Sequence, residues 1–202
     1  MSQGKTILEY WQEAKRVCRE ARGRGEPEFS TGLTFLDEVT GGLRRGEIWI
    51  IAGKTAGGKT SLALQMAHSF AENPKHTILF LSLEMKGWEL ILRMFCEMME
   101  ENYSELLSGK NKINPEKERF FRNFLTRIDF EIVEFGYTFD EIEKIIKSYY
   151  SSKKPDVIFL DFIQLIEWKR YGDERVALME YCLLYTSPSP RDLSTSRMPS
   201  SA

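Results

Sequence analysis

Apolar residues along this chain gather in short unbroken runs, and the stretches between the runs carry apolar residues at every third or fourth position. Unbroken runs of this length are typical of buried strands in a parallel sheet. They lie at residues 48–53, 77–84, 129–135 and 156–167. The stretches with the helical period lie at residues 59–72, 88–99, 115–128 and 138–150. Strands that alternate with helices predict an α/β domain with a mostly parallel sheet and helices on both faces.

A further helix is predicted ahead of the first run. Residues 6–22 place their apolar side chains on one stripe and basic side chains on the opposite side. Residues 23–32 contain Gly, Pro and Ser and indicate a linker. The pattern leaves open whether this helix packs on its own domain or docks on a neighbouring subunit. We therefore predict a linker helix and hinge at residues 1–28 and a folded core at residues 29–181.

The end of the chain has a different character. Residues 182–202 read CLLYTSPSPRDLSTSRMPSSA and are rich in serine and proline, which predicts a disordered tail. The first half of this segment resembles the read-through translation of an adapter used in sequencing libraries, and such scars do not belong to a fold. We therefore expect the native chain to stop near Tyr181 and the native gene to continue beyond it.

Composition narrows the class of protein. The 202 residues carry a net charge of −2, so no strong overall basic field points to nucleic acid. No apolar run reaches the roughly 20 residues of a membrane span, and the N-terminus lacks the apolar core of a secretory signal. The three cysteines are scattered without a C-x-x-C pair, which indicates neither a disulfide framework nor a zinc site. We expect a cytoplasmic protein without a membrane partner.

The clearest chemical motif is GKTAGGKT at residues 53–60, between a predicted strand and a predicted helix. Glycines let the backbone fold into a nest whose N–H groups point at phosphate oxygens, and the following helix adds the positive end of its dipole. Lys59 supplies a cation for the β- and γ-phosphates, and Thr60 supplies a hydroxyl for Mg²⁺. The motif predicts binding of ATP and Mg²⁺. The expected nucleotide contacts are Gly53, Lys54, Thr55, Ala56, Gly57, Gly58, Lys59, Thr60 and Ser61.

Two acidic residues follow predicted strands. Asp161 ends the run VIFLD and is expected to bind Mg²⁺ beside Thr60, although four apolar residues and an aspartate are a weak motif alone. Glu84 ends the run TILFLSLE, where a carboxylate can polarise an attacking water or simply face solvent. Chemistry alone slightly favours the second interpretation for Glu84.

Two other features are interpreted as packing. His68 lies within the predicted helix after the phosphate loop and has no partner at the spacing of a metal site or a triad. Residues 120–127, FFRNFLTR, interleave aromatic and basic side chains as some nucleic-acid-binding segments do. A helix with one packed aromatic face is the favoured interpretation of this segment.

Residues 30–166 resemble the C-terminal, RecA-like ATPase domain of DnaB-type replicative helicases. Three segments carry the resemblance, in the family's order: STGLTFLDEVTGGLRRGEIWIIAG leading into the phosphate loop, LFLSLEM at residues 79–85 and LDFIQLI at residues 160–166. The resemblance implies a RecA-like P-loop fold, with Glu84 as the catalytic glutamate, Asp161 as the magnesium aspartate and Lys59 acting in catalysis. It also implies that the helix at residues 6–22 is the linker helix that docks on the next subunit of a homo-oligomeric ring, expected to be a hexamer.

The chain also departs from the family pattern. Lys54 and Thr55 stand where many bacterial members carry Arg-Pro, which resembles phage versions. We expect this chain to lack the family's globular N-terminal domain and its later motifs, which are the phosphate sensor, the DNA-binding loops and the arginine finger. Gln164 belongs to the magnesium-aspartate segment and is not that sensor. Single-stranded DNA is therefore an expected partner of the full-length protein, and the fragment is expected to be inactive as a helicase alone.

Two functions agree with these residues, whereas a binding module that lost its catalysis is disfavoured because Lys59, Thr60, Glu84 and Asp161 are all present. The first is the ATP-hydrolysing motor domain of a replicative DNA helicase, encoded by a bacterium or by a phage in a bacterial host. The second is another RecA-like ATPase, such as a recombinase or a clock-type signalling ATPase, since these share the loop and the strand-end acid. The pairing of LSLEM with a later LDFIQLI favours the helicase.

Overall fold

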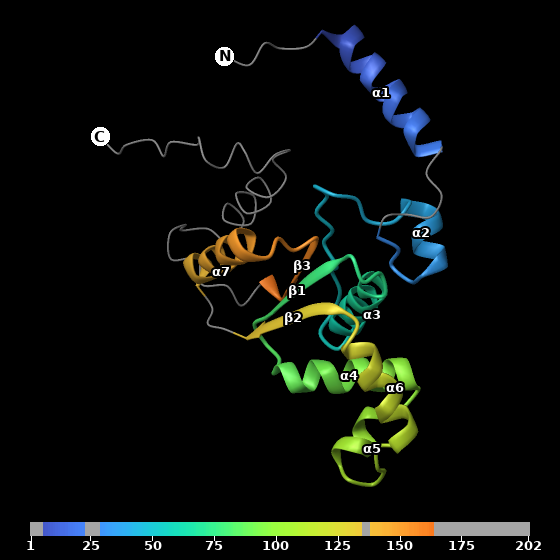
Figure 1. Ribbon diagram of the computed structural model, residues 1–202, viewed down its shortest axis with the longest axis vertical. Coiled ribbons are helices and arrows are strands. Elements are labelled where there is room, and N and C mark those ends of the chain that lie inside the picture. Colours follow the sequence, from blue (N-terminus) through green and yellow to red (C-terminus); the bar gives the residue numbers. More distant parts are fainter. Residues whose placement is uncertain (1–5, 23–28, 135–137, 164–202) are drawn as a thin grey trace, which may run out of the picture.

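The computed structural model describes residues 6–22, 29–134 and 138–163 (Figure 1). The expected hinge at residues 23–28, the later part of the run at 156–167 and the expected tail at residues 182–202 lie outside the described residues. The helices are α1 (Ile7–Arg22), α2 (Thr34–Thr40), α3 (Lys59–Ala71), α4 (Gly87–Met99), α5 (Tyr103–Leu107), α6 (Pro115–Leu125) and α7 (Phe139–Ser152). The strands are β1 (Thr77–Ser82), β2 (Asp129–Glu134) and β3 (Val157–Asp161).

The three strands form one parallel sheet in the order β2-β1-β3. β1 lies at the centre, and five of its six residues are buried, which explains its unbroken apolar run. The register places Ser82 opposite Glu134 on one side and opposite Asp161 on the other. The last residues of the three strands therefore stand in a row along one edge of the sheet. The predicted parallel sheet is confirmed.

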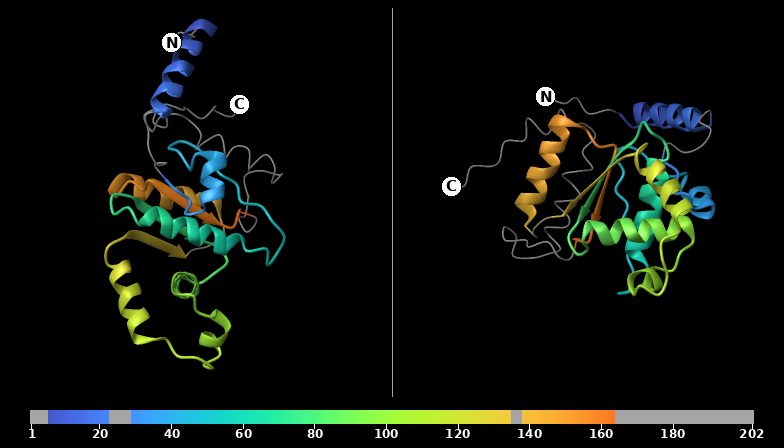
Figure 2. Two further views of the ribbon diagram at one scale, coloured as in Figure 1. Left: turned by 90° about the vertical axis from the view of Figure 1, so that its right-hand side faces the viewer. Right: turned by 60° about the horizontal axis from the view of Figure 1, so that its bottom comes forward.

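Helices cover both faces of the sheet, as predicted (Figures 1 and 2). Ile78 and Phe80 of β1 pack in the cluster that contains residues of α3 and α4, whereas Leu79 and Leu81 pack against α7. Successive side chains of a strand point to opposite faces, so one run of apolar residues serves both layers. The α3 face holds the larger cluster, and β1 and β3 each contribute a phenylalanine to it, Phe80 and Phe159, whose rings stack with centroids 5.5 Å apart.

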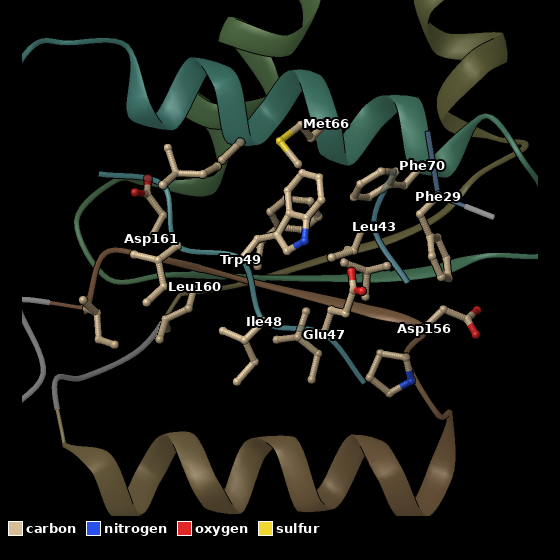
Figure 3. Close-up of a pocket in the computed structure, with 18 of the residues that line it drawn as sticks. Phe29, Leu43, Glu47, Ile48, Trp49, Met66, Phe70, Asp156, Leu160 and Asp161 are labelled. Atoms are coloured by element: carbon tan, nitrogen blue, oxygen red, sulfur yellow. The ribbon is translucent and has the colours of Figure 1, made fainter. Parts of the chain in front are cut away.

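The strand predicted at residues 48–53 is not formed, which corrects that expectation. Residues 47–54 have no ladder partner among the described residues. Figure 3 shows this segment beside β3, with Trp49 directed toward α3 and Ile48 toward α7, as the side chains on the two faces of a strand would be. A cavity of about 550 Å³ lies along this segment and β3. A strand needs a hydrogen-bonded partner about 4.8 Å away, and among the described residues the segment at 48–53 has none.

Two short helices, α2 and α5, were not predicted. They contain 7 and 5 residues, too short for a helical period to stand out from the sequence. The predicted helix at residues 6–22 is present as α1, and Ile7, Leu8, Tyr10 and Trp11 are all exposed on it. The structure therefore gives no support for docking of α1 on its own domain through these side chains.

Candidate nucleotide-binding site

The phosphate loop is a tight turn between residues 48–53 and α3. The Gly57 amide donates to the carbonyl of Lys54 at 3.0 Å, and a Cβ at Gly57 would lie 2.8 Å from that same oxygen. Ala56 and Gly58 have positive φ angles of 60° and 82°, in the left-handed region that favours glycine. Residues 53–58 are exposed. The glycines are thus needed where the backbone turns back on itself, and the loop is accessible to a ligand.

Lys59 is the first residue of α3 and reaches back over the loop. Its Nζ donates to the carbonyl oxygens of Gly53 at 3.2 Å and Lys54 at 3.0 Å. The Lys59 side chain thus crosses the loop, from the N-terminus of α3 back to the first residues of the loop. At that end of α3 the first backbone N–H groups have no partner within the helix, and the dipole favours an anion. An ammonium and a helix N-terminus at one loop make a site for phosphate.

Thr60 of α3 and Asp161 at the end of β3 are in contact at the candidate site. The Thr60 hydroxyl donates to Asp161 Oδ2 at 2.8 Å, although 101 positions separate the two residues. Asp161 is buried at the end of β3, and burial raises its pKa, while the hydrogen bond from Thr60 and the charge of Lys59 offset part of that rise. Because burial disfavours the ionised carboxylate, a cation bound beside Asp161 would favour its charged form.

Mg²⁺ is a hard cation that takes oxygen ligands and keeps several waters, so a few protein oxygens beside bound phosphates suffice. The Thr60 hydroxyl and the Asp161 carboxylate fit this requirement because they are oxygens already within 2.8 Å of each other. Within the described ranges, no group of three or more His, Cys, Asp or Glu residues could hold a metal ion. Thr60 and Asp161 are therefore the residues that could hold such an ion beside a bound nucleotide.

Glu84 lies two residues beyond the end of β1, at the same edge of the sheet as Asp161. The amide of Leu83 donates to the Asp161 carbonyl at 2.8 Å, which extends the β1–β3 pairing by one residue toward Glu84. The side chain of Glu84 is exposed. Glu84 thus lies at the edge of the sheet that carries the candidate nucleotide site, and no hydrogen bond or ion pair among the described residues involves its side chain.

Two residues near Glu84 escaped the sequence analysis. Ser82 Oγ donates to the carbonyl of Met85 at 2.6 Å, and the Gly87 amide donates to Glu134 Oε1 at 2.7 Å. Both hydrogen bonds hold the loop that carries Glu84. A serine within a strand and a glutamate at the end of another give no signal in the sequence, because only the parallel register brings them together.

The remaining predicted residues are placed as follows. Thr55 is exposed on the loop. Ser61 borders a second hollow of about 400 Å³ between α3 and α4, which Gln65, Arg93 and Glu97 also line. His68, interpreted as a packing residue, is largely buried, with Nε2 at 3.6 Å from Glu97 Oε1, and burial lowers its pKa. Ser61 thus borders a hollow that Lys59 and Thr60 do not line.

Comparisons with known proteins identify the family of this chain. The family model described as the DnaB-like helicase C terminal domain matches residues 28–181. The chain belongs to this family. The match is to the helicase family, which is the first of the two possibilities left open by the sequence.

Relatives in this family are replicative helicases of bacteria. The chain is 27% identical over 180 residues to the replicative DNA helicase DnaB of Helicobacter pylori, which covers 85% of this chain and 36% of that protein. It is 36% identical over 86 residues to DnaB of Geobacillus stearothermophilus, which covers 43% of this chain and 18% of that protein. The chain thus spans about a third or less of the length of these two DnaB relatives.

Solved structures share the fold. A DnaB-like replicative helicase described with its interactions with primase superposes with a TM-score of 0.72 at 20% identity, over 90% of this chain and 44% of that one. A second solved structure, described as an ATPase domain, gives a TM-score of 0.69 at 21% identity, over 89% of this chain and 65% of that one. The DnaB-like domain therefore has the RecA-like fold expected from the resemblance.

Proposed function

We propose that this DnaB-like domain is the ATP-binding and ATP-hydrolysing motor of a replicative DNA helicase. The observation that carries the proposal is the hydrogen bond between Thr60 and Asp161, 2.8 Å long, beside the phosphate loop. It unites the helix after the loop with the end of the strand that the family resemblance identifies as the site of the magnesium aspartate. A glycine-rich turn without a ligand would need neither residue.

Each residue then has a role that its position supports. The amides of residues 53–58 and the N-terminus of α3 bind phosphate oxygens, and Lys59 leaves the loop carbonyls to neutralise the β- and γ-phosphates. Thr60 and Asp161 hold Mg²⁺ through oxygen, and this ion when bound neutralises negative charge that develops on the phosphates. Glu84 orients a water and accepts its proton. Lys59 and Glu84 are thus the proposed catalytic residues.

We also propose the assembly and the partner that the family resemblance implies. α1 exposes Leu8, Tyr10 and Trp11 on a short helix, and a helix of this kind is stable only when its apolar stripe is covered. A neighbouring subunit of a homo-oligomeric ring, expected to be a hexamer, covers it. Single-stranded DNA binds the assembled full-length protein, which works in a bacterial cytoplasm and is encoded by the bacterium or by a phage. Among the described residues, none of the helices is both long enough and apolar enough to cross a membrane.

Nucleotide titration by calorimetry tests the core of this proposal. The chain should bind ATP in the presence of Mg²⁺, and binding should weaken when Mg²⁺ is removed with EDTA. Phosphate release is then measured with and without single-stranded DNA, on this chain and on a full-length protein that contains it. Absence of ATP binding by the folded chain would overturn the proposal. Binding without DNA-stimulated hydrolysis by the full-length protein would overturn its helicase part alone.

A further inference from the structure

The residues at the ends of the three strands each hold a different part of the proposed site. Asp161 binds the Thr60 hydroxyl, Ser82 binds the Met85 carbonyl, and Glu134 binds the Gly87 amide. The register places Ser82 between the other two. Two of these three hydrogen bonds act on the loop at residues 83–86, which carries Glu84.

Glu134, the last residue of β2, caps the N-terminus of α4. The N-cap residue of α4, Lys86, has an extended backbone but makes no side-chain cap hydrogen bond, because an ammonium cannot accept one. The Glu134 carboxylate supplies the missing acceptor at 2.7 Å from the Gly87 amide, and its negative charge suits the positive end of the helix dipole. Lys86 Nζ lies 3.9 Å from the same carboxylate. The cap fixes where α4 begins, and so where the loop ends.

The loop at residues 83–86 is therefore held at both ends. At its start, the Leu83 amide is bound to the Asp161 carbonyl and Ser82 Oγ to the Met85 carbonyl. At its end, Glu134 holds Gly87. A short loop with fixed ends has few conformations, so the direction of Glu84 is set by groups that never touch a nucleotide.

We propose that Glu134 is a positioning residue for Glu84, and this inference rests on the proposed catalytic role of Glu84. Glu134 acts through the cap on α4: it keeps the loop in the conformation that directs the Glu84 carboxylate at the edge of the sheet where Thr60 and Asp161 meet. Misplacement of a catalytic group by about 1 Å can cost about 10²-fold in rate. Loss of the cap should therefore weaken binding of a transition-state mimic and leave ground-state nucleotide binding unchanged.

The test uses an assembled full-length protein that contains this chain, because the family resemblance implies that a neighbouring subunit contributes an arginine to the site. It measures the affinity for magnesium ADP alone and with aluminium fluoride, which mimics the transferred phosphoryl group. Transition-state analogues bind at least about 10²-fold more tightly than ground-state ligands. Glu134→Ala should reduce the tightening caused by aluminium fluoride about tenfold and change the affinity for ADP alone less than twofold. Glu134→Gln keeps an oxygen acceptor for the Gly87 amide and should retain most of the tightening.

Gly87→Ala separates positioning from stability. A Cβ at Gly87 would lie 2.9 Å from Glu134 Oε1, so the flexible carboxylate must move away. Alanine is nevertheless a better helix former than glycine. Gly87→Ala should therefore lose the tightening as Glu134→Ala does, without a lower unfolding midpoint in urea. This variant keeps the test informative where Glu134→Ala unfolds.

The matched control is Asn114, which caps α6 by accepting from the Glu116 and Lys117 amides. Asn114→Ala removes a helix cap of the same kind that touches neither the loop nor a strand end. It should leave the tightening unchanged. An equal loss in Asn114→Ala, or full tightening in both Glu134→Ala and Gly87→Ala, would overturn the positioning role.

Glu84→Gln separates this inference from the function on which it rests. If Glu84 acts as proposed, Glu84→Gln loses the tightening, and adding Glu134→Ala to it causes no further loss. Tightening in Glu84→Gln equal to that of the unaltered assembled protein, or no tightening in the unaltered assembled protein, would exclude the catalytic role of Glu84 itself. Loss in Glu84→Gln with none in Glu134→Ala would remove only the role of Glu134.

Discussion

The Thr60 hydroxyl donates a hydrogen bond of 2.8 Å to Asp161, from the first turn of the helix after the phosphate loop to the end of β3. The parallel sheet and α3 bring together two residues that lie 101 positions apart in the sequence. Parallel strands present their carboxyl ends at one edge, and a helix N-terminus at that edge attracts anions. The hydroxyl and the carboxylate thus lie where a nucleotide-bound cation is expected.

Removal of either oxygen should abolish the effect of Mg²⁺ on nucleotide binding. Thr60→Val and Asp161→Asn should each bind ATP about equally with Mg²⁺ and with EDTA, since they lack an anionic or hydroxyl ligand for the ion. The unaltered chain should bind more tightly with Mg²⁺. Calorimetric titration under both conditions measures the difference. A full Mg²⁺ effect in both variants would show that the ion is held elsewhere.

Lys59→Ala should weaken ATP binding with and without Mg²⁺, in contrast to the two variants above. The ammonium group makes charge-assisted hydrogen bonds to phosphate, each worth roughly 1.5–3 kcal/mol, so an affinity loss of at least tenfold is expected. Lys75→Ala is the control, because this lysine is exposed and lies beyond the far end of α3. Equal ATP affinity in Lys59→Ala and Lys75→Ala would exclude the phosphate loop as the binding site.

Glu84→Gln should retain ATP binding and lose most hydrolysis in an assembled full-length protein. The amide keeps the size of the side chain but cannot accept a proton from water, and general-base catalysis contributes about 10²–10⁴-fold. Phosphate release at saturating ATP measures the loss. Glu118→Gln, an exposed position on α6, controls for removal of a negative charge. Hydrolysis at the unaltered rate in Glu84→Gln would make Glu84 a bystander at the end of the strand.

The sequence predicted the parts of the fold whose pattern is local. β1, β2 and the four longer helices after the phosphate loop lie close to their predicted residues, because each shows its own period over enough positions. β3 begins within one residue of its predicted start but ends at Asp161, earlier than the run at 156–167 predicted. The prediction of a strand at residues 48–53 was wrong because strand formation also depends on pairing, which is not local. Its apolar pattern is real, as Trp49 and Ile48 face opposite layers, but a strand also requires a neighbour, and the sequence pattern does not state which segments pair.

The aromatic segment at residues 120–127 shows the same limit at a finer scale. Phe121 is buried, with its ring centroid 5.3 Å from that of Phe95, as the packing interpretation predicts. Phe120 beside it is 62% exposed. Likewise, the phosphate loop was recognisable because its residues are contiguous, whereas Ser82 and Glu134 become neighbours only through the register of β1 and β2. Contacts that depend on pairing stay invisible until the sheet is known.

A final prediction concerns Asp37, which ties the segment before the phosphate loop to the domain. Its carboxylate accepts from Ser30 Oγ at 2.7 Å and from the amide and hydroxyl of Thr31 at 3.0 and 2.8 Å. The Ser30 carbonyl in turn accepts from Ser69 of α3 at 3.0 Å. Burial alone would raise the pKa of Asp37, but the hydrogen bonds from Ser30 and Thr31 outweigh it and hold the pKa below its ordinary value of 3.8.

A carboxyl whose pKa is lower in the folded than in the unfolded state stabilises the fold above its unfolded pKa. That contribution is lost as the pH falls through the folded value, which lies below 3.8. Asp37→Ala should therefore lower the free energy of unfolding at pH 7, by about 1–3 kcal/mol for the hydrogen bonds removed.

The difference in free energy of unfolding between the unaltered chain and Asp37→Ala should narrow as the pH falls below 3.8, since the unaltered chain then loses the same contribution. Urea denaturation at pH 7 and at several lower pH values measures it, with Glu38→Ala, exposed on the same helix, as control. A gap that stays constant down to pH values well below 3.8 would mean that the Asp37 carboxylate contributes no charge-dependent stability.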